Sequence, residues 1–366
     1  MTSATLQENI VEDTANSQPT ETMKAAVIRQ FGDVDVLQYE EIDTPKPKPG
    51  HILIKVLAAG INRLDHYLRE GSVVPELPFP HILGADAVGE VVALGEGVTN
   101  VKLGERVIPA PGFPLKEEDD HIRPAVTAPS FALPGLHIWG SYAQYMEVPA
   151  RWVVKDDTGL SPEEVATLPV VLATSVRSVK EVGEVKAGDK VLIQAGASGS
   201  GSMQIQVAKA LGAQVATTVR DDAKGEYAKA LGADLVINTR KEDFVEQVKA
   251  WTGGQGADVV IDNLGGDVLP KSIDAVRPLG TVVVYGFVAG TQTTFDITKF
   301  YFAQKKLRGS MASDPENLAW GLEQIRTGRI KPTLDRTLPL SQAAEAHRLI
   351  ATNQVAGNIV LLPWAD

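Results

Sequence analysis

A glycine-rich segment near the middle of the chain has the residue types and spacing of a phosphate-binding turn. Small residues run from Ala195 to Gly201, between the apolar run 190–193 and a segment whose apolar residues recur at helical spacing. We expect a buried strand, a tight turn and a helix ended by Gly212. Such a turn lets backbone N–H groups approach a pyrophosphate at the positive end of the helix dipole. Dinucleotide binding is therefore predicted, with these contacts: Gly196, Ser198, Gly199, Ser200 and Gly201.

The turn departs from the usual G-x-G-x-x-G pattern because its middle position is Ser198, so the neighbouring elements must support the prediction. Strand-like runs alternate with helix-like segments after the turn, and the runs are 214–219, 235–237, 258–262 and 281–285. Alternation of this length predicts an α/β fold with a doubly wound parallel sheet of the Rossmann type. The alternative is a glycine turn that merely joins a strand to a helix.

Composition restricts the classes of function that are open to the chain. Its 366 residues are enough for two globular domains, and its formal net charge is −11. Unspecific binding of nucleic acid or of an anionic membrane needs a basic surface, so neither partner is expected. The chain contains no cysteine, which excludes disulfides, thiolate zinc ligands and a cysteine nucleophile.

The part of the chain before the glycine-rich turn has a different character. Residues 1–22 are acidic, without Lys, Arg or a long apolar run, and predict a disordered acidic tail rather than a targeting signal, hence a cytoplasmic protein. Short apolar runs from residue 23 to about 149 predict a separate β-rich domain. Inside it, residues 109–139 form a long proline-rich loop, and loops of this length are usually functional or interaction elements.

The order of these parts resembles the medium-chain dehydrogenase/reductase superfamily, and the resemblance covers about residues 23–363. Its most specific motif consists of Asn62, Asp65, Tyr67, Arg69 and Gly71, which match the N-x-x-D-x-Y-x-R-x-G signature of the zinc-independent quinone oxidoreductases. Three further matches lie at 83–89, 104–107 and 211–213.

This resemblance implies a division of the chain into domains. It implies a GroES-like catalytic domain over 23–168, an NAD(P)-binding Rossmann domain over 169–310 and a return to the catalytic domain over 311–366. The segment 306–310 is similar to the edge strand that often pairs across a dimer in this superfamily, so a homodimer is expected, with an internal edge strand as the alternative.

The resemblance also implies that zinc is absent. The zinc-dependent alcohol dehydrogenases of this superfamily hold a catalytic zinc with Cys, His and Cys, and the matching positions here are Asn62, Ala85 and Val170. The 109–139 loop stands where that branch has a four-cysteine structural zinc lobe, so we expect an emptied lobe. It contains His121 and His137, but two histidines without a defined spacing are more often surface or packing residues.

Without a metal, the chemistry favours acceptors that spread negative charge. Reducing a simple ketone develops a full alkoxide, whereas a quinone or a conjugated carbonyl delocalises the charge, so hydrogen bonds can suffice. Asn62 resembles the family asparagine beside the substrate carbonyl, and its amide can donate to a developing oxyanion. Tyr67 can donate similarly or supply a proton. Both are candidate catalytic residues, with helix capping and packing as their respective alternatives, and Asp65 is expected to cap or to pair with Arg69.

The end of the first strand after the glycine-rich turn, residues 214–219, indicates the choice of cofactor. Instead of the Asp or Glu that binds the ribose hydroxyls of NAD, the chain has Thr218, Arg220 and Lys224 there. These residues resemble the T-V-S-x-x-x-K pattern of NADPH-using quinone oxidoreductases, and two cations can hold a 2′-phosphate. NADPH is therefore predicted rather than NADH, with Asp221 or Asp222 on the ribose as the alternative.

The remaining cofactor contacts are predicted from strand ends and from the resemblance. Open parallel sheets bind ligands at the carboxyl ends of their strands, and Thr174 matches a threonine near the nicotinamide ring, with helix packing as its alternative. The predicted contacts are Thr174, Asn263, Gly286, Phe287 and Asn358. We thus expect an NADPH-dependent, zinc-independent reductase of quinones or other conjugated carbonyls. The alternatives are an enoyl (C=C) reductase, an alcohol dehydrogenase, or a nucleotide-bound structural protein with little turnover.

Overall fold

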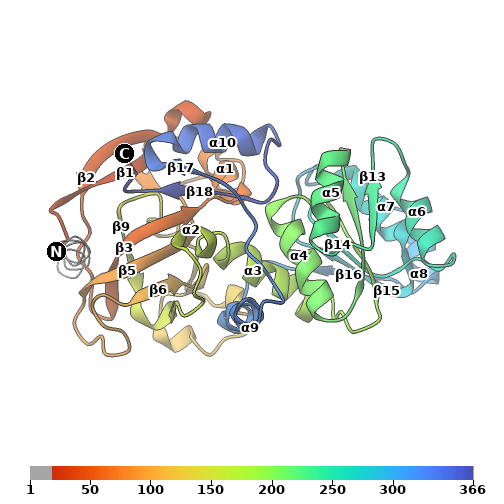
Figure 1. The fold of residues 1–366 in the computed structure, drawn as a ribbon, viewed down its shortest axis with the longest axis horizontal. Coiled ribbons are helices and arrows are strands. Elements are labelled where there is room, and N and C mark those ends of the chain that lie inside the picture. Colours follow the sequence, from red (N-terminus) through yellow and green to blue (C-terminus); the bar gives the residue numbers. More distant parts are fainter. Residues whose placement is uncertain (1–18, 366) are drawn as a thin grey trace, which may run out of the picture.

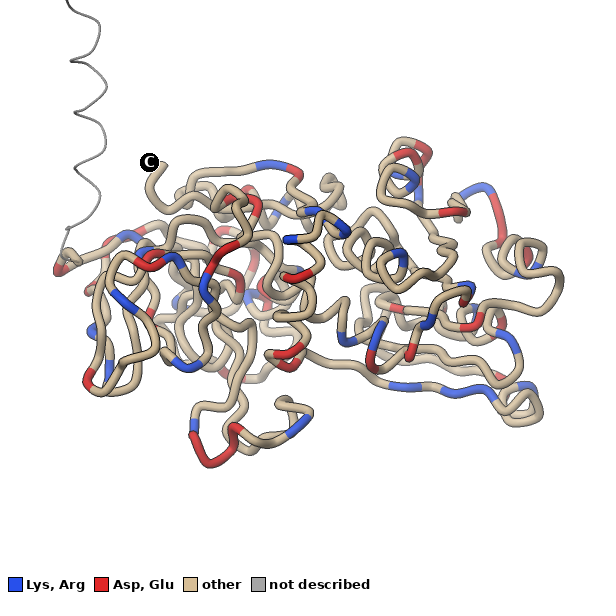
Figure 2. Tube along the Cα trace, turned by 60° about the horizontal axis from the view of Figure 1, so that its bottom comes forward, with Lys and Arg blue, Asp and Glu red and all other residues tan. Residues whose placement is uncertain are grey.

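The computed structural model describes residues 19–365 and places them in two sheet-based domains that lie side by side (Figure 1). Residues 1–18, on which most of the predicted disordered tail falls, lie outside the described residues. Lys and Arg are spread among Asp and Glu over both domains (Figure 2). None of the helices in the described part of the chain has the length and apolarity needed to cross a membrane.

The sheet in the middle of the chain is wholly parallel, with the strand order β13–β12–β11–β14–β15–β16. The strands are β11 (Lys190–Ile193), β12 (Gln214–Val219), β13 (Leu235–Asn238), β14 (Ala257–Asp262), β15 (Val276–Val284) and β16 (Lys306–Gly309). The order reverses between β11 and β14, and such a switch point is where open parallel sheets bind ligands. The predicted Rossmann-type fold is confirmed.

Helices cover both faces of this sheet because side chains of successive strand residues point to opposite faces. Val191 and Ile193 of β11 pack with one group of helices, while Leu192 packs with the other. The first group is α3 (Pro169–Val176), α4 (Gly199–Ala210), α5 (Asp222–Ala230) and α9 (Pro315–Arg326). The second group is α6 (Phe244–Trp251), α7 (Leu269–Ala275) and α8 (Ile297–Phe302).

The other domain is built on a seven-stranded sheet whose strands come from the segments before and after the parallel sheet in the chain. Its order is β10–β6–β5–β3–β18–β17, and β9 also pairs with β3. The strands are β3 (His51–Gly60), β5 (Asp86–Leu94), β6 (Arg106–Pro109), β9 (Tyr145–Pro149), β10 (Val153–Lys155), β17 (Leu334–Pro339) and β18 (Asn358–Leu362). A small sheet of β1 (Thr22–Ile28), β2 (Gln38–Asp43) and β4 (His81–Ile82) completes it, with helices α1 (Arg63–Glu70), α2 (Pro162–Val165) and α10 (Ala343–Ala351).

The 109–139 loop is an ordered lobe with short elements of its own. Strands β7 (Phe113–Pro114) and β8 (Phe131–Ala132) pair, and the 3₁₀ turns η2 (Glu117–Asp119) and η3 (Ala125–Thr127) lie between them. The carboxylate of Asp119 accepts hydrogen bonds from the N–H and the hydroxyl of Ser130. Sequence patterns missed these elements because each has only two or three residues.

One strand begins earlier than predicted. The sequence predicts a strand over 281–285, but β15 starts at Val276, which pairs with Ala257. The register then shifts, so that the next pair joins Val259 to Thr281. The residues skipped by the shift include Pro278 and Gly280, which is why the sequence pattern hides the start of the strand.

Candidate active site

A cavity of about 1120 Å³ lies between the carboxyl ends of the parallel strands and the β-rich domain. Most of the predicted site residues line it: Asn62, Tyr67, Thr174, Ser198, Gly199, Ser200, Thr218, Arg220, Lys224, Asn263, Gly286, Phe287 and Asn358. Gly196 and Gly201 are not among the residues of its lining. The cavity is thus shared by the two domains, and its volume exceeds the upper end of the usual range for a drug-sized ligand, about 1,000 Å³.

The glycine-rich turn joins β11 to α4 and leaves the start of α4 facing the cavity. A Cβ atom on Gly196 would collide with the side chain of Thr217, and one on Gly201 would collide with the carbonyl oxygen of Ala195. These two glycines therefore permit close packing of strand and helix. Ser198 caps the helix, because its Oγ accepts a hydrogen bond from the Gly201 N–H at 3.1 Å. The turn has the geometry of a phosphate cradle.

Asn62 lines the cavity from the β-rich domain and lies in a buried corner. Its Nδ2 donates to Oδ2 of Asp86 at 2.8 Å, and the N–H of Val170 donates to Oδ1 of Asp86 at 2.6 Å. Asp86 is 2% exposed, and this burial raises the pKa of its carboxyl group to about 7. Ala85 lines the cavity beside them, so the fold brings Asn62, Ala85 and Val170 together around one carboxylate.

A second buried carboxylate fixes the backbone of Asn62. Oδ2 of Asp65 accepts hydrogen bonds from the N–H of Asn62 and from the hydroxyl of Tyr142, both at 2.8 Å. Burial raises the pKa of Asp65 to about 6. Asp65 therefore caps α1, as one of its two predicted roles required. Pairing with Arg69 is not found, because the guanidinium of Arg69 contacts other residues, namely His66, Asp33 and Glu70.

Tyr67 and Phe287 meet across the cavity from the two domains. Tyr67 belongs to α1, Phe287 follows β15, and their rings stack with a centroid distance of 5.0 Å and an interplanar angle of 25°. Both residues line the cavity. The phenol of Tyr67 is therefore held by ring stacking beside the corner that contains Asn62.

Several of the predicted cofactor contacts make hydrogen bonds within the protein. Thr218 donates to Oε1 of Gln194 at 2.6 Å and accepts the N–H of Ala195 at 3.0 Å, so it braces the glycine-rich turn. The hydroxyl of Ser200 lies 3.0 Å from that of Tyr285. The amide of Asn358 donates to Oγ1 of Thr333 at 2.9 Å.

The end of β12 carries cations and occupied carboxylates. Asp221 caps α5 by accepting the Lys224 N–H at 2.8 Å, and Asp222 pairs with Lys241 at 2.6 Å. Lys224 Nζ donates to the carbonyl oxygen of Asn353 at 2.8 Å. Arg220 is exposed, and its side chain makes no hydrogen bond or ion pair with the described residues. This end of the cavity is therefore suited to an anionic group.

The wall of the cavity also contains an unused acceptor. Oδ1 of Asn263, just beyond β14, is buried and has no hydrogen-bond partner among the described residues. Gly286 packs against the backbone of Asn263, where a Cβ atom would approach the carbonyl oxygen to 2.6 Å. A buried polar atom without a partner costs free energy unless a ligand satisfies it. Together with the phosphate cradle, this acceptor fits a bound dinucleotide.

Reasoning from the sequence missed many residues of the cavity lining, among them three cations, Arg63, Arg240 and Lys241. Within the described part of the chain, Arg63 donates to neutral acceptors alone, the carbonyl oxygen of Ile350 and Oδ1 of Asn353, both at 3.2 Å. Arg240 and Lys241 enter the lining from the loop after β13. The signals were present, because Arg63 follows Asn62 within the signature motif and the other two follow a strand whose carboxyl end faces the site.

Comparison with known proteins gives matches over both domains. The model described as alcohol dehydrogenase GroES-like domain matches residues 48–158, and the one described as zinc-binding dehydrogenase matches residues 199–326. A 2-haloacrylate reductase from a Burkholderia species is 33% identical over 361 residues, covering 93% of this chain and 99% of that protein. A quinone oxidoreductase from Pseudomonas aeruginosa is 29% identical, covering 91% and 97%.

Solved structures match with the same coverage. An NAD-dependent alcohol dehydrogenase superposes with a TM-score of 0.87 at 32% identity, covering 93% of this chain and 99% of its own. A crotonyl-CoA carboxylase/reductase, AntE, solved in complex with NADP, superposes with a TM-score of 0.86 at 26% identity, covering 96% and 97%. These proteins share the arrangement of both domains with this chain.

Proposed function

Because the chain belongs to the quinone oxidoreductase-like branch of the medium-chain dehydrogenase/reductase superfamily and is an NAD(P)H-dependent oxidoreductase, we propose that it uses NADPH, without zinc, to reduce quinones or other conjugated carbonyls. The observation that carries this proposal is the buried corner in which Asp86 holds the amide of Asn62. A preorganised amide donor suits an acceptor whose negative charge is already delocalised.

The residues of this corner do not form a zinc site. The positions that match zinc ligands carry an amide, a methyl group and an isopropyl group, in Asn62, Ala85 and Val170. Both oxygens of Asp86 already accept hydrogen bonds. No cluster of three or more possible His, Asp or Glu ligands occurs among residues 19–365. Zinc coordination would need a nitrogen, sulfur or free oxygen donor set that this corner does not offer.

The side chains of the corner can stabilise the acceptor as it gains charge. A bound nicotinamide cofactor supplies the hydride. The amide of Asn62 has two N–H groups, of which one donates to Asp86, so the other is available to the carbonyl oxygen of an acceptor. Tyr67, which lines the same cavity, supplies a second donor or a proton. Asn62 binds and orients the oxygen, and Asp86 and Asp65 orient Asn62.

The preference for NADPH is supported by the cations that follow β12 and β13. Arg220, Lys224 and Arg240 all line the cavity. A 2′-phosphate carries the anionic charge that such a group of cations recognises. Asp221 and Asp222, the alternative ribose ligands, already cap a helix and pair with Lys241.

Reduction of a C=C bond conjugated to a carboxylate or a thioester is a second candidate reaction. It is favoured by the names of two similar proteins, the 2-haloacrylate reductase and the crotonyl-CoA carboxylase/reductase. The same Asn62 amide would then stabilise the enolate that forms when hydride adds to the β-carbon.

An acceptor panel tests the proposal. Quinones, enones, acrylates, enoyl thioesters and simple alcohols are assayed with each cofactor on protein whose zinc content has been measured. We expect turnover of quinones and enones with NADPH in protein that contains far less than one zinc per chain. Product analysis separates C=C from C=O reduction. Activity confined to simple alcohols, or lost together with stoichiometric zinc, would contradict the proposal.

We also infer a homodimer formed across β16. This strand is one of the two edges of the parallel sheet, and apolar side chains in it or beside it are exposed: Ile297, Tyr301, Phe302, Leu307 and Met311. An exposed edge strand with apolar neighbours favours pairing with a second copy. Light scattering should give twice the chain mass for the wild type and the single chain mass for Leu307→Lys, with Leu103→Lys, an exposed leucine of the β-rich domain, as control.

A further inference from the structure

The tip of the 109–139 lobe lies behind one wall of the cavity. Residues 310–313, which join β16 to α9, line the cavity. A second hollow of about 520 Å³ is lined by Pro124 and Val126 from the lobe tip and by Arg177. The residues common to both hollows are Tyr285, Gly286, Phe287, Ser310 and Met311. These shared residues separate the lobe tip from the cavity.

Asp314, the residue directly after the wall segment 310–313, accepts a hydrogen bond at each of its two carboxylate oxygens. Its Oδ1 accepts the N–H of Ala125 at 2.6 Å, and its Oδ2 accepts from Nη1 of Arg177 at 2.8 Å. Asp314 is only 8% exposed. Removing either donor would leave a buried carboxylate oxygen without its partner, which is unfavourable.

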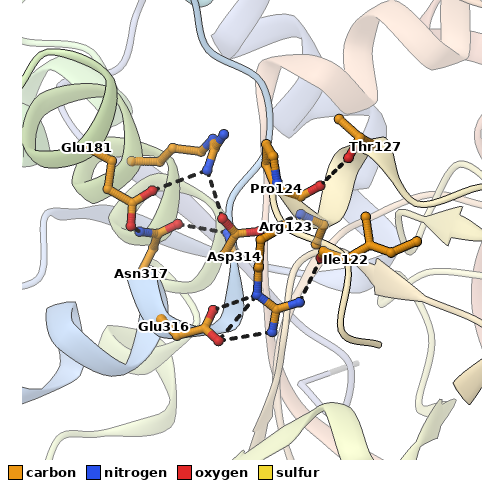
Figure 3. Close-up of polar contacts among 10 residues, drawn as sticks. Ile122, Arg123, Pro124, Thr127, Glu181, Asp314, Glu316 and Asn317 are labelled. Carbon is orange, nitrogen blue, oxygen red and sulfur yellow. Dashed lines mark hydrogen bonds and ion pairs between the residues drawn. The ribbon is translucent and has the colours of Figure 1, made fainter. Parts of the chain in front are cut away.

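The hydrogen bonds of Asp314 belong to a closed ring of contacts around the start of α9. Arg177 Nη1 also donates to Oε2 of Glu181 at 3.2 Å, and Oε1 of Glu181 accepts from Nδ2 of Asn317 at 2.6 Å. Oδ1 of Asn317 in turn accepts the N–H of Asp314 at 2.7 Å, which completes the ring (Figure 3). Outside the ring, Arg123 of the lobe forms an ion pair with Glu316 at 2.9 Å. That outer pair is exposed and contributes little by itself.

The wall segment itself needs external support. Ala312 has a φ of +53°, a left-handed conformation that a residue with a Cβ atom rarely adopts. Such a conformation persists only where the surrounding structure determines it. The ring at Asp314, two residues further along the chain, supplies that constraint.

We propose that Ala125 and Arg177 are positioning residues which, through Asp314, fix the wall segment 310–313 and thereby set the affinity of the cavity for its dinucleotide. This inference depends on the proposed binding of NADPH in the cavity. The lobe, which the resemblance suggested to be an emptied zinc lobe, then has a function in the reaction cycle because its tip supports the cofactor site from outside.

Two substitutions that each remove one charge of the Arg177–Asp314 pair test the inference. Arg177→Gln removes the charge that neutralises Asp314. Asp314→Asn keeps a residue that can cap α9, but it replaces one of the two acceptor oxygens with an NH₂ group, so the side chain no longer has a separate oxygen for each donor. We expect the Kd of NADPH, measured by fluorescence titration, and its KM to rise about tenfold, a typical size for coupling through a contact network, while kcat changes less than twofold. The double variant should be no weaker than the weaker single variant, because both act through one contact. Arg177→Lys should recover most of the affinity.

A matched control comes from the other end of the same helix. Arg326 Nη2 lies 2.6 Å from Oδ1 of Asp157, so this ion pair also ties α9 to a neighbouring segment, but away from the wall. Arg326→Gln should leave the Kd of NADPH within twofold. The inference would be overturned if the Kd of NADPH changed less than threefold in both test variants, or if it changed as much in the control. If Asp314→Asn does not fold, the result for Arg177→Gln decides alone. Preference of the wild type for NADH would contradict the proposed cofactor instead, and the same titrations would then use NADH.

Discussion

Two parts of the cavity lining differ in how they would recognise the proposed ligands. At the proposed catalytic corner, formed by Asn62, Asp65 and Asp86, the side chains are buried and hydrogen-bond to one another and to neighbouring protein groups. At the ribose rim, formed by Arg220 and Lys224, the charges lie near solvent, and Arg220 has no acidic partner among the described residues. The hydrogen bonds of the corner are therefore formed without a ligand. The positive charge of Arg220 at the rim, in contrast, is left for a bound anion to neutralise.

The comparison separates the expected effects of substitutions. A donor held in a buried corner stabilises the charge that develops during reaction, so its loss lowers kcat. A hydrated cation at the rim contributes binding energy that is the same before and during reaction, so its loss raises KM. Each prediction below tests one side of this division.

The largest effect is expected for Asn62→Ala. Loss of one preorganised donor lowers kcat by about 100- to 1000-fold for an enone, while the Kd of NADPH stays unchanged. Steady-state kinetics and a cofactor titration measure the two quantities. Asn100→Ala is the control. Asn100 Nδ2 donates to the backbone carbonyl of Ala150 at 2.7 Å, and neither residue lines the cavity. An Asn62→Ala protein with full turnover would show that Asn62 serves only the fold.

The rim is tested by replacing Arg220 and Lys224 together with Ala. We expect the KM for NADPH to rise by about tenfold to a few hundredfold, and the KM for NADH to stay almost constant, because only NADPH carries the 2′-phosphate. Lys229→Ala is the control, as Lys229 lies on the same helix but pairs with Glu226. Equal effects on both cofactors would mean that these cations do not recognise the phosphate.

The corner should also respond to pH through Asp86, whose pKa burial raises to about 7. The carboxylate form accepts from both Asn62 and Val170, and its fraction falls as pH drops below about 7. We therefore expect kcat to fall several-fold between pH 8 and pH 6 in the wild type. In Asp86→Asn, kcat should be lower and should not follow this titration. A wild-type profile that stays flat over this range would contradict the assignment.

The same titration affects stability with a definite sign. Asp86 binds its proton more tightly in the folded chain than in the unfolded chain, whose carboxyl has an ordinary pKa of 3.8. Its contribution to the free energy of unfolding is therefore fully present below pH 3.8 and is lost as the pH rises through about 7. Denaturant unfolding of wild type and Asp86→Asn over this range measures the difference.

The smallest effect is expected for Tyr67→Phe, which keeps the stack with Phe287 and removes only the hydroxyl. Turnover should fall by less than about tenfold for an enone and less still for a quinone, which needs weaker stabilisation. Parallel assays of both acceptors give the ratio. A larger loss with the quinone would assign the hydroxyl to another task.

The sequence predicted the parallel sheet and the position of its turn because both depend on local patterns. Apolar runs and small residues are visible in the chain itself, and β11, the glycine-rich turn and α4 follow directly from them. The signature motif also placed Asn62 and Tyr67 in one site. These predictions needed no knowledge of contacts between distant segments.

What could not be predicted depends on such contacts. Asp86 lies 24 residues from Asn62 and 84 from Val170 along the chain, and only the fold brings their polar atoms within hydrogen-bond distance. Lys224, which the sequence predicts to bind a 2′-phosphate, also donates to the carbonyl oxygen of Asn353 in the other domain, 129 residues away. Sequence spacing carries no information about these pairings.

The pairing of β18 with β3 has a consequence for folding. Val360 and Leu361 pair with Gly60 and Ala59, and these β3 residues lead directly into the corner that holds Asn62. Contacts between residues so far apart in sequence close a long loop and form slowly. The strands of the parallel sheet all lie within 190–309, so we expect this sheet to form first and the β-rich sheet to form later. Until β18 arrives, this end of β3 is an open edge at which another chain can add, so aggregation during refolding should begin there.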